Sequence, residues 1–147
     1  MTIKANALTP IPNDWSLQEA ATLPCAGLTA WRAIMEEGNL QPNETILVQG
    51  SGGVSIFALQ LAKAHGANVI ATTSSDEKAE KLKSLGADEV VNYKEHPQWG
   101  KEVLKLTANE GVDHVVEVAG GESFNESIRC AKLGGHISII GILDGNT

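Results

Sequence analysis

A short glycine-rich stretch, Gly50-Ser51-Gly52-Gly53, contains the residues whose types and spacing point most clearly to a chemical role. It follows a β-branched apolar run and precedes an apolar pattern of helical period that starts at Val54. Glycines at such a turn allow unusual dihedral angles and let the backbone approach a pyrophosphate with no Cβ in between. The first amides of the following helix add donors and the positive end of its dipole. We therefore expect Gly50, Ser51, Gly52, Gly53 and Val54 to hold the pyrophosphate of a dinucleotide.

A second interpretation of this stretch stays open, because a glycine-rich turn can simply join a strand to a helix. Ser55 stands where the dinucleotide fingerprint has its third glycine. Its small side chain still allows the helix to pack closely on the strand, and its hydroxyl could add a donor.

The end of the next predicted strand bears on the choice of dinucleotide. NAD-specific domains carry an acid here, about 20 residues after the glycines, that binds the ribose hydroxyls. This sequence has Thr73 and Ser74, whose hydroxyls can donate to a 2′-phosphate, and Lys78 adds a positive charge one helical turn away. We therefore expect NADP(H) to be preferred over NAD(H). In the alternative, Ser74 only caps a helix and Lys78 is a solvated lysine; the nearby acids Asp76 and Glu77 favour that alternative.

Strands and helices alternate regularly around these residues. Helices are expected at 54–65, at 74–85 with a Ser74/Glu77 capping box, at 97–107 and at 122–133. Apolar strand patterns cover 45–49, 68–73, 89–93, 113–118 and 136–141. This alternation, with nearly continuous apolar strands, predicts an α/β fold: a Rossmann-type, doubly wound parallel sheet covered on both faces.

The N-terminal part has a different pattern. Residues 1–14 contain two prolines and are expected to form an irregular lead-in, followed by one dinucleotide-binding domain over 15–147. Ser16 and Glu19 form a capping box, and Pro24 is expected to interrupt the helix that starts there. A second helix should then continue to Gly38.

Composition excludes several classes of partner. The 147 residues are 42% apolar and carry a net charge of −7, which argues against nucleic acid and against anionic membranes. No run resembles a signal peptide or a membrane span. The two distant cysteines, Cys25 and Cys130, indicate a reducing compartment, so a cytoplasmic location is expected.

As a set, these features resemble the medium-chain dehydrogenase/reductase superfamily, which includes zinc-type alcohol dehydrogenases and quinone oxidoreductases. The resemblance covers nearly the whole chain from about residue 10. It is carried by residues 19–31, 48–54, 85–93, 111–113 and 134–137 and by Gly141.

The resemblance implies roles for further residues. Thr29 matches the position that contacts the nicotinamide end, and Tyr93 matches a tyrosine near the 2′-phosphate in quinone-reductase-like members. The ends of the fourth and fifth strands would line the nicotinamide ribose with Val118, Ala119, Ile140 and Gly141. Ordinary packing at strand ends is the alternative for Tyr93, Val118 and Ile140.

Two departures from the family pattern limit the expected activity. The family's N-terminal catalytic domain is not found in this sequence, and neither is the sixth strand of the nucleotide domain. We therefore expect cofactor binding without turnover by this chain alone, with a small-molecule substrate bound only together with the catalytic domain. The fifth strand would then form a sheet edge, which leaves a homodimer open.

The second departure concerns the metal. Cys25 matches a zinc-ligand position of zinc-type alcohol dehydrogenases, but no histidine shares a metal-like spacing with it. Cys25 is therefore expected to be a free, buried thiol, and zinc is not expected in this chain. No nucleophile–base pair stands out, so no catalytic residue is assigned. Hydride chemistry would belong to the cofactor.

Three hypotheses follow. The first is the cofactor domain of an NADP(H)-dependent alcohol dehydrogenase or quinone reductase. The second is a non-catalytic dinucleotide-binding or interaction module. The third, a structural domain, predicts no nucleotide binding at all.

Overall fold

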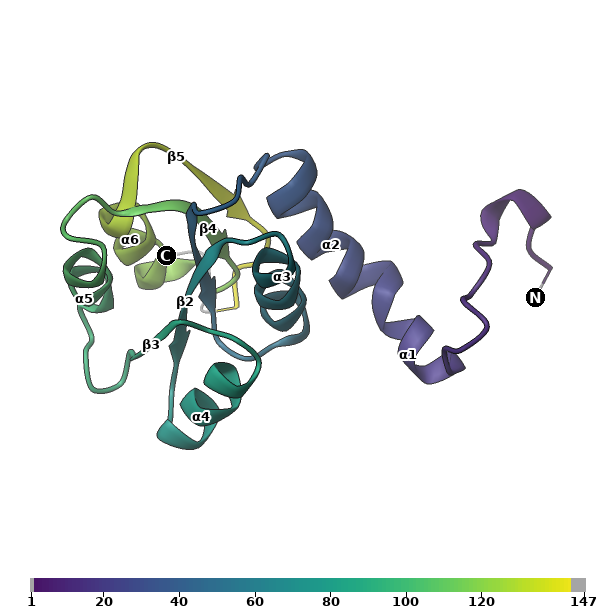
Figure 1. Cartoon of the computed structure of the whole chain (residues 1–147), viewed down its shortest axis with the longest axis horizontal. Helices are drawn as coiled ribbons and strands as arrows, with labels where there is room; N and C mark the ends of the chain where they lie inside the picture. Colours follow the sequence, from purple (N-terminus) through teal and green to yellow (C-terminus); the bar gives the residue numbers. More distant parts are fainter. Residues whose placement is uncertain (1, 144–147) are drawn as a thin grey trace.

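The computed structural model describes residues 2–143, and its centre is a five-stranded sheet (Figure 1). The strands are β1 Thr45–Gln49, β2 Asn68–Thr73, β3 Glu89–Asn92, β4 Val112–Glu117 and β5 Ala131–Ile139. Every neighbouring pair is parallel and the order is β3-β2-β1-β4-β5. This is the Rossmann strand order through its fifth strand, so the predicted fold class is confirmed.

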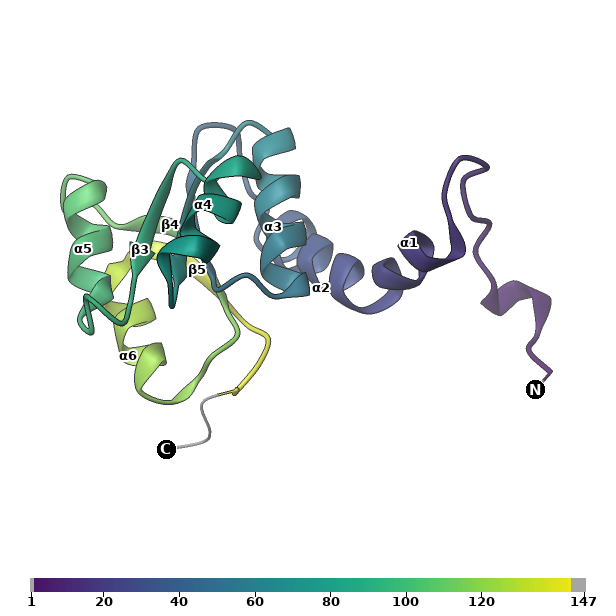
Figure 2. The same ribbon diagram turned by 90° about the horizontal axis from the view of Figure 1, so that it is seen from below.

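Helices cover both faces of the sheet. They are α3 Gly53–Ala64, α4 Asp76–Ser84, α5 Trp99–Leu106 and α6 Gly121–Cys130. Figures 1 and 2 show α5 and α6 on one face, with α3 and α4 on the other. Successive strand residues point to opposite faces, so Ile46 and Val48 pack in the core beneath α3, whereas Leu47 packs with Trp99 and Val103 of α5. Strands buried on both faces explain the nearly continuous apolar runs.

A helical arm precedes the sheet and projects away from it (Figure 1). It consists of α1 Leu17–Thr22, a π-helical turn Leu23–Gly27, α2 Leu28–Trp31 and a second π-helical turn Arg32–Glu36. The capping box of Ser16 and Glu19 is confirmed. The prediction that Pro24 interrupts the helix is wrong, because the chain stays helical through a wider π turn. Such a turn accommodates a ring that would clash with a carbonyl of an α-helix.

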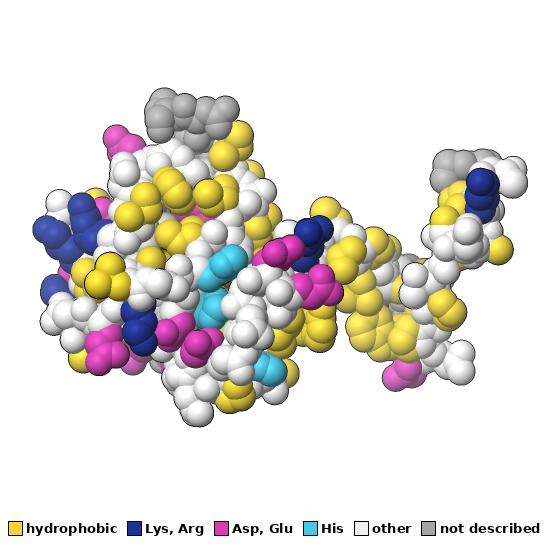
Figure 3. Space-filling model, turned by 90° about the horizontal axis from the view of Figure 1, so that it is seen from above, with side chains coloured by type: hydrophobic (Ala, Val, Ile, Leu, Met, Phe, Trp, Pro, Cys, Tyr) yellow, Lys and Arg dark blue, Asp and Glu magenta, His cyan; other side chains and the backbone are white. Residues whose placement is uncertain are grey.

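The arm exposes apolar side chains, and its beginning is mostly irregular. Residues 2–14 hold one short 3₁₀ turn, Ala5–Ala7. Figure 3 shows hydrophobic side chains along the arm. Leu17, Leu28 and Trp31 of its helices are exposed, as is Trp15 just before α1. Within residues 2–143, none of the helices has the length and apolar character needed to cross a bilayer.

Two helix boundaries differ from the sequence prediction. Ser75, not Ser74, caps α4, and its Oγ accepts from the Lys78 amide. The last helix ends at Cys130 instead of Leu133, because Ala131 already pairs with Val112 in the sheet. Residues 132–135 then bulge out, since the next paired residue of β4, His114, lies opposite His136. Sheet pairing therefore ends this helix earlier than its local pattern indicates.

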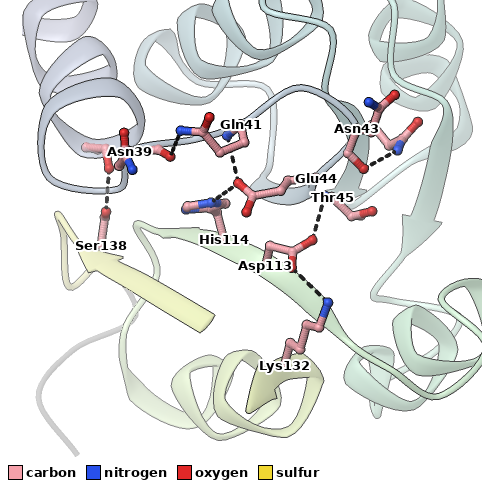
Figure 4. A network of polar contacts seen from close by, with 11 residues as sticks. Asn39, Gln41, Asn43, Glu44, Thr45, Asp113, His114, Lys132 and Ser138 are labelled. Atoms are coloured by element: carbon pink, nitrogen blue, oxygen red, sulfur yellow. Dashed lines mark hydrogen bonds and ion pairs between the residues drawn. The ribbon is translucent and has the colours of Figure 1, made fainter. Parts of the chain in front are cut away.

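A polar network joins the amino ends of β1 and β4, at the end of the sheet opposite the glycine loop (Figure 4). Glu44 Oε2 lies 2.8 Å from Nε2 of the buried His114 and accepts from the Gln41 amide at 2.7 Å. Asp113 accepts from the Thr45 amide at 2.9 Å and from Lys132 Nζ at 3.1 Å. Burial opposes ionisation of Asp113, but these two donors outweigh it and lower its pKa. These contacts join the two strands and leave His114 buried.

Candidate functional site

The glycine loop lies at the carboxyl end of β1 and exposes its backbone. Gly50 has a φ of +72°, a conformation that favours glycine, and its amide donates to the Thr72 carbonyl of β2 at 2.9 Å. A Cβ placed on Gly50 or Gly52 would meet no heavy atom within 4 Å. The main chain at these two positions therefore borders open space that a ligand can fill.

The start of α3 completes this cradle. Gly52 is the N-cap and provides no side-chain hydrogen bond, so the amides of the first turn point toward the same open space. Ser55 does not add a ligand donor: it is 2% exposed and its Oγ donates to the Gln49 carbonyl at 2.6 Å. Its hydroxyl instead braces the loop from inside. A Cβ on Gly53 would lie 3.3 Å from that of Ala26, so α3 packs closely on the arm.

A cavity of about 440 Å³ opens beside the loop, between the ends of β1 to β4 and the starts of α5 and α6. Four residues predicted from the sequence line it: Gly50, Tyr93, Val118 and Ala119. Its other lining residues are Gln49, Thr72, Pro97, Trp99, Glu122, Ser123, Glu126 and Leu143. The carboxyl ends of β1 and β4 meet here, where the strand order reverses direction, which is the usual ligand position in such sheets. The volume is in the range of small-molecule sites.

The tip of β2 presents its residues unequally. Thr73 is 1% exposed, and its hydroxyl donates to the Ser75 carbonyl at 3.4 Å. Ser74 is half-buried and Lys78 is exposed on the first turn of α4. Ser74 and Lys78 are thus open to a ligand at this tip, whereas Thr73 faces the protein interior.

The segments that follow β4 and β5 lie next to each other. The Ile140 amide donates to the Glu117 carbonyl at 2.8 Å. A Cβ on Gly141 would lie only 2.7 Å from the Val118 carbonyl oxygen, so glycine is needed for this close approach. Val118, Ala119, Ile140 and Gly141 therefore share one end of the sheet.

Three functional candidates were missed by the sequence analysis: Gln49, Glu117 and Ser127. All three are buried; Gln49 lines the cavity, and Glu117 and Ser127 lie behind it. Gln49 Nε2 lies 2.8 Å from Glu117 Oε2 and 2.9 Å from Ser127 Oγ. The only sequence signal is a polar residue at the end of each of two apolar strands, and nothing in the spacing shows that they meet.

Two other predicted residues, Thr29 and Cys25, lie on the arm, outside the cavity. Thr29 is half-buried on α2. Cys25 is a free thiol but exposed, so its predicted burial is wrong; the π turn places it on the side of the arm that faces away from the core. Among residues 2–143, no three His, Cys, Asp or Glu side chains cluster closely enough to bind a metal. Cys25 alone does not fit a zinc site.

The thiol of the other cysteine, Cys130, has low reactivity. Cys130 is fully buried on α6, and burial raises the pKa of its thiol to about 12. Its Sγ donates to the Ser127 carbonyl at 3.5 Å. The thiolate, the reactive form, is therefore strongly disfavoured at neutral pH.

A parallel sheet in this order, with an open glycine loop between its first strand and the following helix, defines a protein of the Rossmann class. The family described as zinc-binding dehydrogenase matches residues 53–147. The chain therefore belongs to this family, which confirms the resemblance to the medium-chain dehydrogenase/reductase superfamily.

Individual relatives match over most of the chain. A zinc-type alcohol dehydrogenase-like protein of Schizosaccharomyces pombe is 48% identical over 96% of this chain and 41% of its own length. The structure of an NAD-dependent alcohol dehydrogenase is 43% identical, with a TM-score of 0.83 over 89% of this chain and 38% of that one. A mycobacterial protein complexed with NADPH is 32% identical, with a TM-score of 0.86 over 93% and 42%. The chain thus spans about two fifths of the length of these relatives.

Proposed function

We propose that this chain is the NADP(H)-binding domain of an oxidoreductase similar to alcohol dehydrogenases and quinone reductases, and that it holds the nicotinamide for hydride transfer. The observation that carries the proposal is the open main chain at Gly50 and Gly52, at the start of α3 and beside the cavity. Amides at a helix start bind a pyrophosphate without any lysine or arginine, which suits a chain of net charge −7.

The other site residues would orient the two halves of the cofactor. Val118, Ala119, Ile140 and Gly141 would line the nicotinamide ribose, and Thr29 would contact the nicotinamide end from the arm. Tyr93, which is 40% exposed at the cavity, would lie near the adenosine phosphate. The bound cofactor supplies the hydride chemistry, and the chain supplies its binding and orientation.

The preference for NADP(H) rests on Ser74 and Lys78. Both are accessible at the tip of β2, where a hydroxyl and an ammonium group can bind a 2′-phosphate. The Thr73 hydroxyl donates to the Ser75 carbonyl and is not free for the cofactor. Thr73 instead matters because an acid at this position would repel the 2′-phosphate. The relatives do not favour one dinucleotide, since one is complexed with NADPH and another is NAD-dependent.

Substrate turnover would need protein beyond this chain, because the relatives are more than twice as long. The small-molecule substrate would bind between this domain and the family's catalytic domain. The two free cysteines suit a reducing compartment, which supports a cytoplasmic location. The edge position of β5 would suit pairing of two copies as a homodimer.

The test is a calorimetric titration of the chain with NADPH and with NADH. We expect NADPH to bind at least about tenfold more tightly, equivalent to roughly 1.4 kcal/mol for the phosphate contacts. Lys78→Ala should remove most of this difference and leave NADH affinity unchanged. Lys81→Ala, which alters an exposed lysine further along α4, is the matched control and should change neither affinity.

Two results would contradict the proposal at different levels. Equal affinity for the two dinucleotides would contradict the preference for NADP(H) but not the proposal that the chain is a cofactor-binding domain. If neither dinucleotide bound, the chain would be a structural domain.

A further inference from the structure

A buried carboxylate lies directly behind the cavity wall. Glu117, the last residue of β4, has no exposed surface. It accepts four hydrogen bonds: from Gln49 Nε2 at 2.8 Å, from Ser127 Oγ at 2.5 Å, and from the amides of Ala119 and Gly120 at 2.8 and 2.9 Å. An ionised group inside a protein is tolerated only with such partners, so this site is built around the carboxylate.

The Gln49 side chain completes the arrangement. Its Oε1 accepts from the Val118 amide at 3.0 Å and from the Ala119 amide at 3.2 Å. Its Nε2 donates to Glu117 and to Ser127. Gln49 ends β1 and Glu117 ends β4, and both side chains face α6, the helix that carries Ser127. Three separate elements therefore converge on one cluster.

The cluster holds the main chain that follows β4. All three amides of residues 118–120 donate to the side chains of Gln49 or Glu117. At Gly120 the chain turns with a φ of +71° to begin α6. This loop has left the sheet, so side chains supply the acceptors that a neighbouring strand would otherwise provide.

We propose that Glu117, Gln49 and Ser127 are positioning residues that set residues 118–120 against the bound dinucleotide. Gln49, Val118 and Ala119 line the cavity, whereas Glu117 and Ser127 do not. Glu117 thus acts on the ligand through the backbone that it holds. This inference rests on the proposed function, because it assigns the loop to a dinucleotide.

An exchange of carboxylate and amide tests the proposal. Glu117→Gln places two NH₂ groups against each other, and Gln49→Glu places two carboxylates against each other. The double variant again has one amide facing one carboxylate, and acceptors remain for the amides of 118–120. We expect each single variant to weaken NADPH binding about tenfold or more, and the double variant to return within about threefold of the unaltered chain.

The measurement is NADPH fluorescence titration, made well below the melting temperature of every variant, with folding checked by circular dichroism. Val115→Ala is the matched control: it removes buried volume from β4 on the same face without touching the cluster. It should lower the melting temperature and leave the Kd unchanged. Recovery of binding in the double variant would distinguish positioning from general destabilisation.

Other outcomes would overturn the inference. Single variants that melt earlier but bind NADPH like the unaltered chain would show that the cluster serves stability alone. If neither single variant folds, Ser127→Ala removes one donor to Glu117, and an unchanged Kd there would have the same meaning. Failure of the proposed function is distinguishable, because the unaltered chain would then bind neither NADPH nor NADH.

Discussion

The glycines of this protein differ in the space around the position that a Cβ would occupy. A Cβ on Gly50 or Gly52 would border open space, whereas on Gly141 it would meet the Val118 carbonyl at 2.7 Å. The first two positions therefore remain available to a ligand, and the third is required by packing. A side chain at either loop position would therefore extend into the open space and not into the protein.

Substitution at Gly52 separates binding from folding. Gly52→Val should weaken dinucleotide binding at least about tenfold, because its methyl groups would occupy the space of the pyrophosphate. Gly52 has an ordinary φ of −77° and no Cβ neighbours, so the free energy of unfolding should fall by no more than about 1 kcal/mol. Calorimetric titration and urea denaturation measure the two effects. Gly52→Ala should give a smaller loss of affinity, and normal binding by Gly52→Val would place the phosphate elsewhere.

At the scale of single elements, two neighbouring serines before α4 have different roles: Ser75 caps the helix, and Ser74 stays accessible. The sequence favours Ser74 as the cap because Glu77 follows three residues later. The structure instead has Ser75 with its Oγ 3.4 Å from the Lys78 amide. Ser74 is thereby released at the strand tip, beside the proposed phosphate position.

The two serines should therefore respond differently to removal of the hydroxyl. Ser75→Ala should lower the free energy of unfolding by about 0.5–1 kcal/mol through loss of the cap, with little effect on binding. Ser74→Ala should leave stability nearly unchanged and weaken NADPH binding a few-fold. Thermal melts and titrations of the pair measure this. The reverse pattern would restore Ser74 as the cap.

Over the whole molecule, the two ends of the sheet serve different purposes. The carboxyl ends border the cavity, while charged side chains tie the amino ends together. Asp113 joins β1 to Lys132, and Asp88 accepts from Lys63 and from the Val69 amide at 2.7 Å. Burial opposes ionisation of Asp88 too, but its donors outweigh burial and lower its pKa.

These lowered pKa values predict acid sensitivity. A carboxylate whose folded pKa lies below its unfolded value stabilises the fold above an ordinary pKa of about 4, and this stabilisation disappears as pH falls through the folded pKa. The free energy of unfolding should therefore change little between pH 7 and 5 on account of Asp88 and Asp113, and fall below about pH 4.

Asp113→Asn is the corresponding variant. It should cost about 1–2 kcal/mol at pH 7, because it weakens the bonds from the Thr45 amide and Lys132. It should also reduce the loss of stability in acid, as measured by urea denaturation at each pH. An acid loss as large as in the unaltered chain would assign the sensitivity to other carboxylates.

The sequence alone determined the elements and the glycine loop. Strand alternation with helices, the capping box of Ser16 and Glu19, and the open turn at Gly50–Gly53 depend on residues close together in the chain, so local spacing was enough to predict them. The same alternation predicted a parallel, doubly wound sheet, and the structure added the strand order β3-β2-β1-β4-β5.

The tertiary structure alone decided which side chains meet and which are hidden. Gln49 and Glu117 lie 68 residues apart, and only the parallel pairing of β1 with β4 brings their ends together above α6. Pairing of β4 with β5 ended the last helix at Cys130, and packing of β2 within the sheet left Thr73 buried. Contacts between distant residues and burial depend on how elements pack, and no local pattern in this single sequence records that packing.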